Sequence, residues 1–356
     1  MIRITDLDQY ACPPDLTVRD AVRRLDQSTY LFQVVVDGDG KLCGTLTDGD
    51  VRRAMLRGVA LDASVDEAMN RAPVAGRAGA ERDNLDRLAT IGLAEPFLPI
   101  LDDDGVLREI LLSTAAPDSG LRALVMAGGS GRRLGARTRS IPKPLLPVGG
   151  KPILEHVLSR LEEAGIADIT ISVHYLADQI EHFIEARESQ AQIVTLHEDR
   201  PLGTAGALGR LGPPPSGSNL LVVNGDIVTQ VDFATMRAFH DRHDYDGTIA
   251  VIRHDTDIPF GVVRHGDDGS FERVDEKPVL SHFVAAGVYL LSPAFAGLVA
   301  RGEAMDMDEL LNLGREVGLS IGLFPIHEYW VDVGRPDDLD RAERDHAPRD
   351  TKGGTA

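Results

Sequence analysis

A glycine-rich segment, Gly128-Gly129-Ser130-Gly131, directly follows the apolar run of residues 121–127. Two cations, Arg133 and Lys143, lie shortly after it, and Lys143 stands between two prolines. Glycines after a buried strand let the backbone approach a phosphate closely, and arginine and lysine supply the opposite charge. The spacing therefore favours a binding site for a polyphosphate that begins at Ala127.

The end of this segment excludes two other phosphate-binding motifs. A dinucleotide fingerprint needs a third glycine where Leu134 stands, and a P-loop needs a terminal Gly-Lys-Ser/Thr that is absent here. Dehydrogenase chemistry and P-loop chemistry are therefore not expected.

The elements that must position these residues alternate in the order of βαβ units. Apolar runs bounded by turn residues predict strands, and apolar residues three or four apart predict helices. Strands are expected at residues 121–127, 168–173, 192–197, 220–223 and 283–291, and helices at residues 152–164, 176–187 and 309–317. This order predicts an α/β domain with a Rossmann-like mixed, mainly parallel sheet.

The glycine-rich segment continues into a longer motif. It runs on through Thr138, Pro142-Lys143-Pro144-Leu145-Leu146-Pro147-Val148 and Gly150-Lys151-Pro152. This run resembles the signature of the sugar nucleotidyltransferase superfamily, which includes mannose-1-phosphate guanylyltransferases and glucose-1-phosphate thymidylyl- and uridylyltransferases. The resemblance extends from about residue 121 to 342. It implies that an NTP and a sugar 1-phosphate are converted to a nucleotide sugar and pyrophosphate.

The resemblance also implies roles for charged residues. Arg133 would bind the triphosphate and the departing pyrophosphate, and Lys143 would lie near the α-phosphate or the sugar phosphate. Asp226 follows the apolar run 220–223, and Asp332 lies in Tyr329-Trp330-Val331-Asp332. These two aspartates match the family's metal ligands, and Mg²⁺ is the expected ion, because it prefers carboxylates completed by substrate oxygens.

The segment from Glu198 to Leu208 reads the base in this family, and Gly203 and Thr204 lie within it. Many thymidylyl and uridylyl members carry glutamine where this chain has Glu198. An ionised glutamate only accepts hydrogen bonds, and guanine offers two donors side by side, which favours GTP. UTP and dTTP stay open, because a carboxylate can also accept from one uracil N–H. Glu198 could instead cap the following turn.

The sugar-binding residues implied by the resemblance are Gly261, Glu276 and Ala285, with Lys277 neutralising the sugar phosphate. Many mannose-1-phosphate guanylyltransferases have asparagine at the position of Ala285 and threonine at that of Arg335. Glucosamine, mannose and heptose 1-phosphates are therefore all open. A non-catalytic nucleotide sensor is the alternative from another class, and the intact set of charged motif residues argues against it.

The first 113 residues contain two copies of one unit. Each has a helix, a strand, an Asp- and Gly-rich turn and a second strand, and the first copy adds a helix from about Asp50. The pattern resembles a pair of CBS domains. The residues that carry this resemblance are Val34-Val35-Val36-Asp37 and Gly44-Thr45-Leu46-Thr47-Asp48-Gly49-Asp50-Val51-Arg52. In that family Thr47 and Asp50 would hold a nucleotide, although they could equally cap a helix. CBS pairs commonly dimerise, so a homo-oligomer is expected.

Composition sets the remaining expectations. The 356 residues carry a formal net charge of −19, which disfavours nucleic acid as a partner. Cys12 and Cys43 have no framework spacing, and no apolar leader is evident, so a cytoplasmic protein without a membrane segment is expected. We expect a CBS pair at residues 1–113, a linker at 114–120, a catalytic domain at 121–346 and a flexible tail at 347–356.

Overall fold

The computed structural model describes residues 2–91, 96–113, 121–212 and 218–346. It divides into two compact units. The first is the described part of Met1–Asp118 together with Ala234–Asp244, and the second is the described part of Ser119–Phe233 and Tyr245–Ala356. The expected linker at residues 114–120 and the expected tail at residues 347–356 lie outside the described residues.

The first unit contains two small sheets of similar design. In one, β2 (Ala11–Cys12) is parallel to β3 (Phe32–Val36), and β3 is antiparallel to β4 (Leu42–Thr47). In the other, β5 (Gly76–Arg77) is parallel to β6 (Phe97–Leu101), β6 is antiparallel to β7 (Leu107–Leu112), and β1 (Ile2–Ile4) adds to β7. The helices of this unit are α1 (Val18–Gln27), α2 (Asp48–Leu56), η1 (Val65–Glu67), α3 (Glu81–Ala89) and α7 (Phe233–His243), whose first residue belongs to the second unit.

The two sheets also share their turn chemistry. The aspartate that opens each turn, Asp37 or Asp102, accepts a 2.9 Å hydrogen bond from the backbone N–H four residues later. The rings of Phe32 and Phe97, the first residues of β3 and β6, stack with centroids 3.9 Å apart. The structure thus contains the internal repeat that the sequence predicts.

The second unit is built on a seven-stranded sheet with the order β12-β11-β8-β13-β18-β15-β19. These strands are β8 (Arg122–Met126), β11 (Asp168–Val173), β12 (Gln192–His197), β13 (Leu220–Asn224), β15 (Gly247–Asp257), β18 (Val279–Leu291) and β19 (Ile321–Pro325). The first four strands in the order are parallel, β18 is antiparallel to both neighbours, and β15 is parallel to β19. The expected mixed, mainly parallel sheet is confirmed.

Shorter elements complete the second unit. Its helices are η2 (Arg132–Thr138), η3 (Lys143–Leu145), α4 (Ile153–Glu163), α5 (Ala177–Ala186), α6 (Gly206–Leu211), α8 (Pro293–Ala296), α9 (Met307–Glu316) and α10 (Pro336–His346). Its small antiparallel pairs are β9 (Pro147–Val148) with β10 (Lys151–Pro152), β14 (Ile227–Thr229) with β20 (Trp330–Asp332), and β16 (Val262–His265) with β17 (Phe271–Asp275). Among the described residues, every helix is too short or too polar to cross a lipid bilayer.

The strand order reverses direction next to β8. The chain moves from β8 outward through β11 to β12 on one side, and it returns to place β13 on the other side. In open α/β sheets, ligands bind at the carboxyl ends of the strands where the order reverses. The fold therefore marks the ends of β8 and β13 as the place for a site.

A buried core holds this sheet against three helices. Leu124 of β8 and Val222 of β13 cluster with Leu208 of α6, Phe295 of α8 and Leu310 of α9. All five are fully buried. The core thus fixes the strands whose ends form the expected site.

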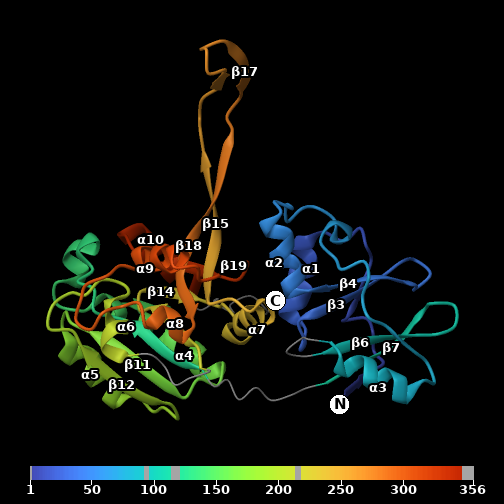
Figure 1. The fold of residues 1–356 in the computed structure, drawn as a ribbon, viewed down its shortest axis with the longest axis horizontal. Helices are drawn as coiled ribbons and strands as arrows, with labels where there is room; N and C mark the ends of the chain where they lie inside the picture. Colours follow the sequence, from blue (N-terminus) through green and yellow to red (C-terminus); the bar gives the residue numbers. More distant parts are fainter. Residues whose placement is uncertain (1, 92–95, 114–120, 213–217, 347–356) are drawn as a thin grey trace, which may run out of the picture. The chain divides into compact units, whose positions relative to one another are not determined.

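Two strands leave the sheet together as a long ribbon. β15 pairs with β18 as far as Asp257 and Val279, whereas β19 accompanies β15 only to Val251. Figure 1 shows this ribbon standing out from the body of the second unit, with β17 at its far end. We call residues 252–284 the arm. The sequence predicts only the inner part of β18, as a strand at residues 283–291.

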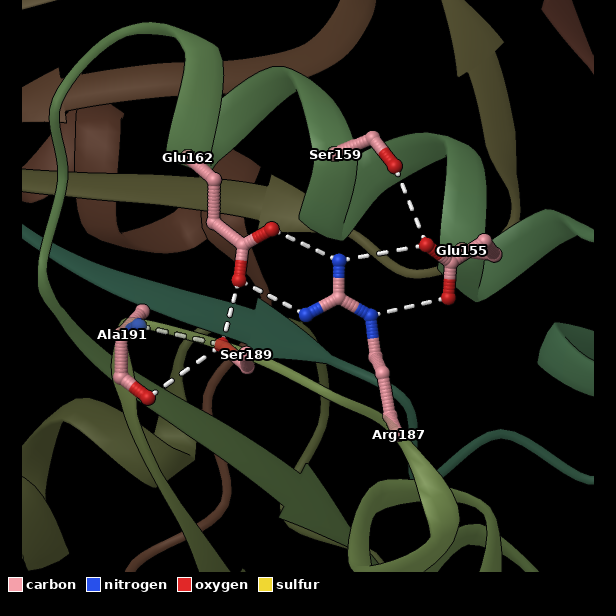
Figure 2. A network of polar contacts seen from close by, with 6 residues as sticks. All are labelled: Glu155, Ser159, Glu162, Arg187, Ser189 and Ala191. Carbon is pink, nitrogen blue, oxygen red and sulfur yellow. Dashed lines mark hydrogen bonds and ion pairs between the residues drawn. The ribbon is translucent and has the colours of Figure 1, made fainter.

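An ion-pair network joins α4 to the chain that follows α5. The Arg187 guanidinium donates to both oxygens of Glu155, at 2.8 and 3.1 Å, and to both oxygens of Glu162, at 2.7 Å each (Figure 2). The hydroxyl of Ser189 donates to Glu162, and that of Ser159 donates to Glu155. The Arg187 side chain is only 9% exposed, so this bidentate arrangement fastens the helices on that side of the unit.

Arg187→Met will destabilise the second unit, because methionine keeps the apolar stem but leaves Glu155 and Glu162 without their shared cation. We expect the free energy of unfolding to fall by about 2 kcal/mol, between the values for exposed and buried ion pairs. Urea unfolding followed by the fluorescence of Trp330, the single tryptophan of the chain, measures the change.

The stability lost in Arg187→Met will depend on pH. Hydrogen bonds, from Arg187 first and from Ser189, hold the pKa of Glu162 below its ordinary value of 4.5. A carboxylate with a lowered pKa stabilises the fold above its unfolded value and loses that contribution as the pH falls through the folded value. The difference in stability between wild type and Arg187→Met should therefore shrink in acid.

Arg122→Met, which removes one part-exposed ion pair with Asp168, is the control and should lower the free energy of unfolding by less than about 1 kcal/mol. An equal loss in both variants would contradict the account.

Candidate nucleotide and metal site

The glycine-rich loop begins where β8 ends. Ala127 is buried, and its N–H donates to the carbonyl of Ser172 at 2.9 Å, which ties the loop to β11. Gly128 is half-buried, and Gly129 is exposed. Gly131 has a φ of 62°, and a Cβ there would lie 2.9 Å from Thr138 and 3.1 Å from Lys143. Only glycine fits this position, so the loop is packed directly against the residue that carries the candidate cation.

Backbone pairing brings the two candidate metal ligands together. Ile227 is opposite Asp332 in the β14–β20 ladder, and the N–H of Val333 donates to the carbonyl of Asp226 at 3.1 Å. The preceding Gly225 donates to the carbonyl of Met126 at 2.9 Å, so this turn lies against the end of β8. The register thus places two carboxylates side by side, next to the glycine-rich loop.

Lys143 bridges the two carboxylates. Its ammonium forms an ion pair with Asp226 and a second with Asp332 at 3.5 Å, although its side chain is only 10% exposed. Burial raises the pKa of Asp332, and the like charge of Asp226 raises it further, whereas Lys143 and Arg133 lower it. The arrangement is a pair of repelling carboxylates that face one shared cation.

Arg133, the other cation expected beside the glycine-rich loop, lies on η2 and is exposed. Its charge lowers the pKa of Asp332, so its guanidinium lies within electrostatic reach of that carboxylate. One apolar cluster supports the segments that carry all four charged residues. Its buried members are Leu134, Leu146, Val148, Ile153, Val228, Val331, Val333, Leu339 and Ala342.

Carboxylate oxygens are the donors that a hard divalent cation prefers. Asp226 and Asp332 can supply one oxygen each, and the Lys143 ammonium already shows that both carboxylates face a common point. The carboxylates are also part-exposed, at 32% and 49%, which leaves them open toward a ligand. The donor set therefore fits Mg²⁺.

Glu198 is buried beneath the glycine-rich loop. One carboxylate oxygen accepts from the Ser172 hydroxyl, and the other accepts from the N–H of Leu202 at 2.9 Å. A Cβ at Gly128 would lie 3.5 Å from the first of these oxygens. Glu198 thus holds the following turn, and it lies against the loop that is expected to hold the nucleotide. Ser172 of β11 donates to this buried carboxylate, a contact that the sequence did not predict.

Thr204 and Gly203 contact the start of α9. The N–H of Thr204 donates to Asp306 at 3.0 Å, and its hydroxyl accepts from the N–H of Met307 at 2.8 Å. Asp306 is the N-cap of α9 and forms a capping box with Glu309. These contacts fix the turn that carries the expected base-reading residues.

The structure separates the expected sugar-binding residues. Ala285 lies at the base of the arm, next to Ala286, whose carbonyl accepts from the Trp330 indole at 2.8 Å. Trp330 therefore ties β18 to the strand that carries Asp332, a role that the sequence did not reveal. Gly261 and Glu276 lie far out on the arm, where a Cβ at Gly261 would be 2.9 Å from the Glu276 carboxylate. Lys277 follows with a φ of 46°.

In the first unit, Thr47 and Asp50 contact each other. Thr47 is the N-cap of α2, its hydroxyl donates to Asp50 at 2.6 Å, and Asp50 accepts from Arg53 at 2.6 Å. The N-cap is therefore Thr47, and Asp50 is the third residue of the helix, because the helix that the sequence predicts from about Asp50 begins two residues earlier, at Asp48. The pair forms a capping box.

Glu198→Ala will destabilise the second unit, because the variant leaves the N–H of Leu202 and the hydroxyl of Ser172 without their buried acceptor. We expect a loss of about 2 kcal/mol in urea unfolding. Ser172→Ala, which removes one donor and keeps the cap on Leu202, is the matched control and should lose about half as much. Unfolding of Glu198→Ala at the wild-type urea concentration would show that these contacts do not hold the turn.

Comparison with known proteins adds independent information. Residues 122–348 match the family model described as nucleotidyl transferase, and residues 4–57 match the CBS domain model. The mannose-1-phosphate guanylyltransferase catalytic subunit beta of Drosophila melanogaster is 31% identical over 231 residues, which are 63% of this chain and 62% of that protein. The protein of the same name from Danio rerio is 33% identical over 226 residues, 62% of each chain. The chain therefore spans less than two thirds of the length of these relatives.

Solved structures show the same fold. HddC from Yersinia pseudotuberculosis is 26% identical with a TM-score of 0.50, covering 63% of this chain and 98% of that one. A putative glucose-1-phosphate thymidylyltransferase from Bacillus anthracis, in complex with a sucrose, is 22% identical with a TM-score of 0.52, covering 66% and 98%. Since the nucleotidyl transferase model covers more than half of the residues, this chain belongs to the nucleotidyl transferase family, with a CBS domain at its N-terminus.

Proposed function

We propose that the second unit transfers a nucleotidyl group from an NTP to a sugar 1-phosphate, giving a nucleotide sugar and pyrophosphate. The observation that carries this proposal is the cluster of Lys143, Asp226 and Asp332 beside a glycine-rich loop at the point where the strand order reverses. The names of the relatives that match residues of this unit support the same reaction class.

The reaction requires the protein to position the two substrates and to offset their negative charge. A phosphate oxygen of the sugar 1-phosphate is already a nucleophile, so no strong general base is needed. It attacks the α-phosphorus in line, and the bond to the pyrophosphate oxygen breaks. Both reactants are anions, so the protein must hold them together against their repulsion. We assign this work to Arg133, Lys143 and Lys277.

Asp226 and Asp332 are the residues that we propose to hold Mg²⁺. When bound, the ion would neutralise phosphate charge close to the reacting phosphorus. Lys143 lies on the same two carboxylates and is therefore placed to turn toward a phosphate oxygen when they take up the ion. The Gly128–Gly131 amides would then contact the remaining phosphate oxygens.

GTP is the nucleotide that we propose, and the guanylyltransferase names of the relatives support it. Glu198 already accepts two hydrogen bonds from the chain, but a carboxylate has about four lone-pair sites. It therefore retains capacity for the N1 and N2 donors of guanine, with Gly203 and Thr204 in the turn that it holds. Mannose 1-phosphate is the sugar that the relatives favour, and glucosamine and heptose 1-phosphates remain alternatives because of Ala285 and Arg335.

The first unit is proposed as a CBS pair at residues 1–113 that binds a regulatory nucleotide near Thr47 and Asp50. The CBS match to residues 4–57 supports it, and so does the repeated sheet. The catalytic domain is proposed at residues 121–346. We place the enzyme in the cytoplasm.

The proposal is tested by pyrophosphate release with Mg²⁺, crossing GTP, UTP, dTTP, CTP and ATP with mannose, glucose, glucosamine and heptose 1-phosphates. We expect release with GTP and one sugar, and a shift toward UTP or dTTP in Glu198→Gln. Release by the wild type only with UTP or dTTP would overturn the choice of GTP. No release with any pair would favour a nucleotide sensor.

The regulatory proposal for the first unit has its own test. Added adenine or guanine nucleotides that leave the rate unchanged would contradict it.

Lys143→Ala should lower kcat by at least about 10²-fold, because it removes a positive charge placed beside the reacting phosphates. Lys41→Ala, an exposed lysine of the first unit, should leave kcat unchanged. Melting curves of both variants check that the fold survives. Wild-type turnover in Lys143→Ala at saturating Mg²⁺ would contradict the assigned role.

A further inference from the structure

The arm exposes apolar side chains on both of its faces. In β18 the alternation puts Val279 and Phe283 on one face and Leu280 and Val284 on the other, and all four are exposed. Phe260 and Phe271, farther out, are 73% and 68% exposed. Strands that are apolar on both faces are normally buried on both faces. The arm therefore has the composition of a covered element.

The arm is also poorly anchored. Among the described residues, no hydrogen bond or ion pair joins residues 258–280 to the body of the second unit; the bonds that the arm makes stay within it, as between Arg264 and Asp275. Its outer part is the two-stranded pair β16–β17, with both edges open. An isolated two-stranded ribbon is marginally stable in water, and open edges invite pairing with another chain.

The arm carries one cation with no partner in the described part of the chain. Lys277 is exposed and forms no hydrogen bond or ion pair with any described residue. Its φ of 46° is unfavourable for an L-residue, and such backbone is concentrated at functional positions. Glu276 precedes it and lies against Gly261. The arm thus presents an unpaired positive charge and a carboxylate away from the Lys143 cluster.

We propose that the arm is exchanged between two copies of this chain, so that Lys277 of one copy completes the phosphate site formed by Arg133, Lys143, Asp226 and Asp332 of the other. A second copy is the partner that presents both an apolar arm of the same kind and an anion-binding site that lacks Lys277. Exchange of identical elements about a two-fold axis is a common route to a dimer. The arm has 33 residues, slightly more than the roughly 20–30 that one side of a standard interface uses.

The inference rests on the proposed function for the role of Lys277, and mixed dimers test it. Asp226→Asn and Lys277→Ala are made as full chains with different tags, co-expressed, and purified through both tags. Each variant alone should lose at least about 10²-fold in pyrophosphate release. If the arm acts on the partner, the mixed dimer has one intact site and should recover about half of the wild-type rate per dimer. If each arm serves its own chain, both sites are damaged, and the mixed dimer stays as slow as the single variants.

The outcomes separate the two proposals. An active wild type with an inactive mixed dimer overturns the exchange and leaves the function standing. An inactive wild type overturns the function, and the mass in solution, measured by light scattering, then tests the interface.

In light scattering we expect a dimer for wild type and a weaker dimer or monomer for Phe260→Ser/Phe271→Ser. Val317→Ser, which changes an exposed apolar residue outside the arm, should leave the mass unchanged. An unchanged dimer in the arm variant overturns the interface.

Discussion

Two carboxylates held at close range constrain everything around the candidate site. The ladder between β14 and β20 fixes Asp226 and Asp332 side by side, although like charges repel. Lys143 offsets that repulsion from an almost buried position, and an apolar cluster beneath the segments prevents the carboxylates from separating. The two carboxylates of such a site favour a positive charge beside them. A nucleotide with its metal supplies a partner for each group: the metal ion for the carboxylates and the phosphates for the lysine.

The sheet explains why this cluster lies where it does. The strand order reverses beside β8, so the loops after β8 and β13 open next to each other. Gly131 and Gly225 then bring the backbone into contact where any side chain would collide. The distant β20 joins through its pairing with β14, and Trp330 fastens it to β18. Segments far apart in the chain therefore converge on one edge of the sheet.

The sequence predicts the strands Asp168–Val173 and Gln192–His197 to the residue, because each is an apolar or alternating run bounded by turn residues. It does not predict β15, whose outer half carries charged residues, such as Arg253 and Asp255, that resemble a loop but pair within the ribbon. The motif positions of Lys143 and Asp226 could be named from their local context. Their contact could not, because it depends on strand order and on a ladder between segments that have no local signature.

The central claim is that Asp226 and Asp332, with Lys143 between them, receive the metal that accompanies the nucleotide. Isothermal titration of GTP into the wild type and into Asp226→Asn, each with and without Mg²⁺, tests it most directly. The account predicts that Mg²⁺ strengthens GTP binding to the wild type and has little effect on the variant. Equal strengthening by Mg²⁺ in both proteins would contradict it.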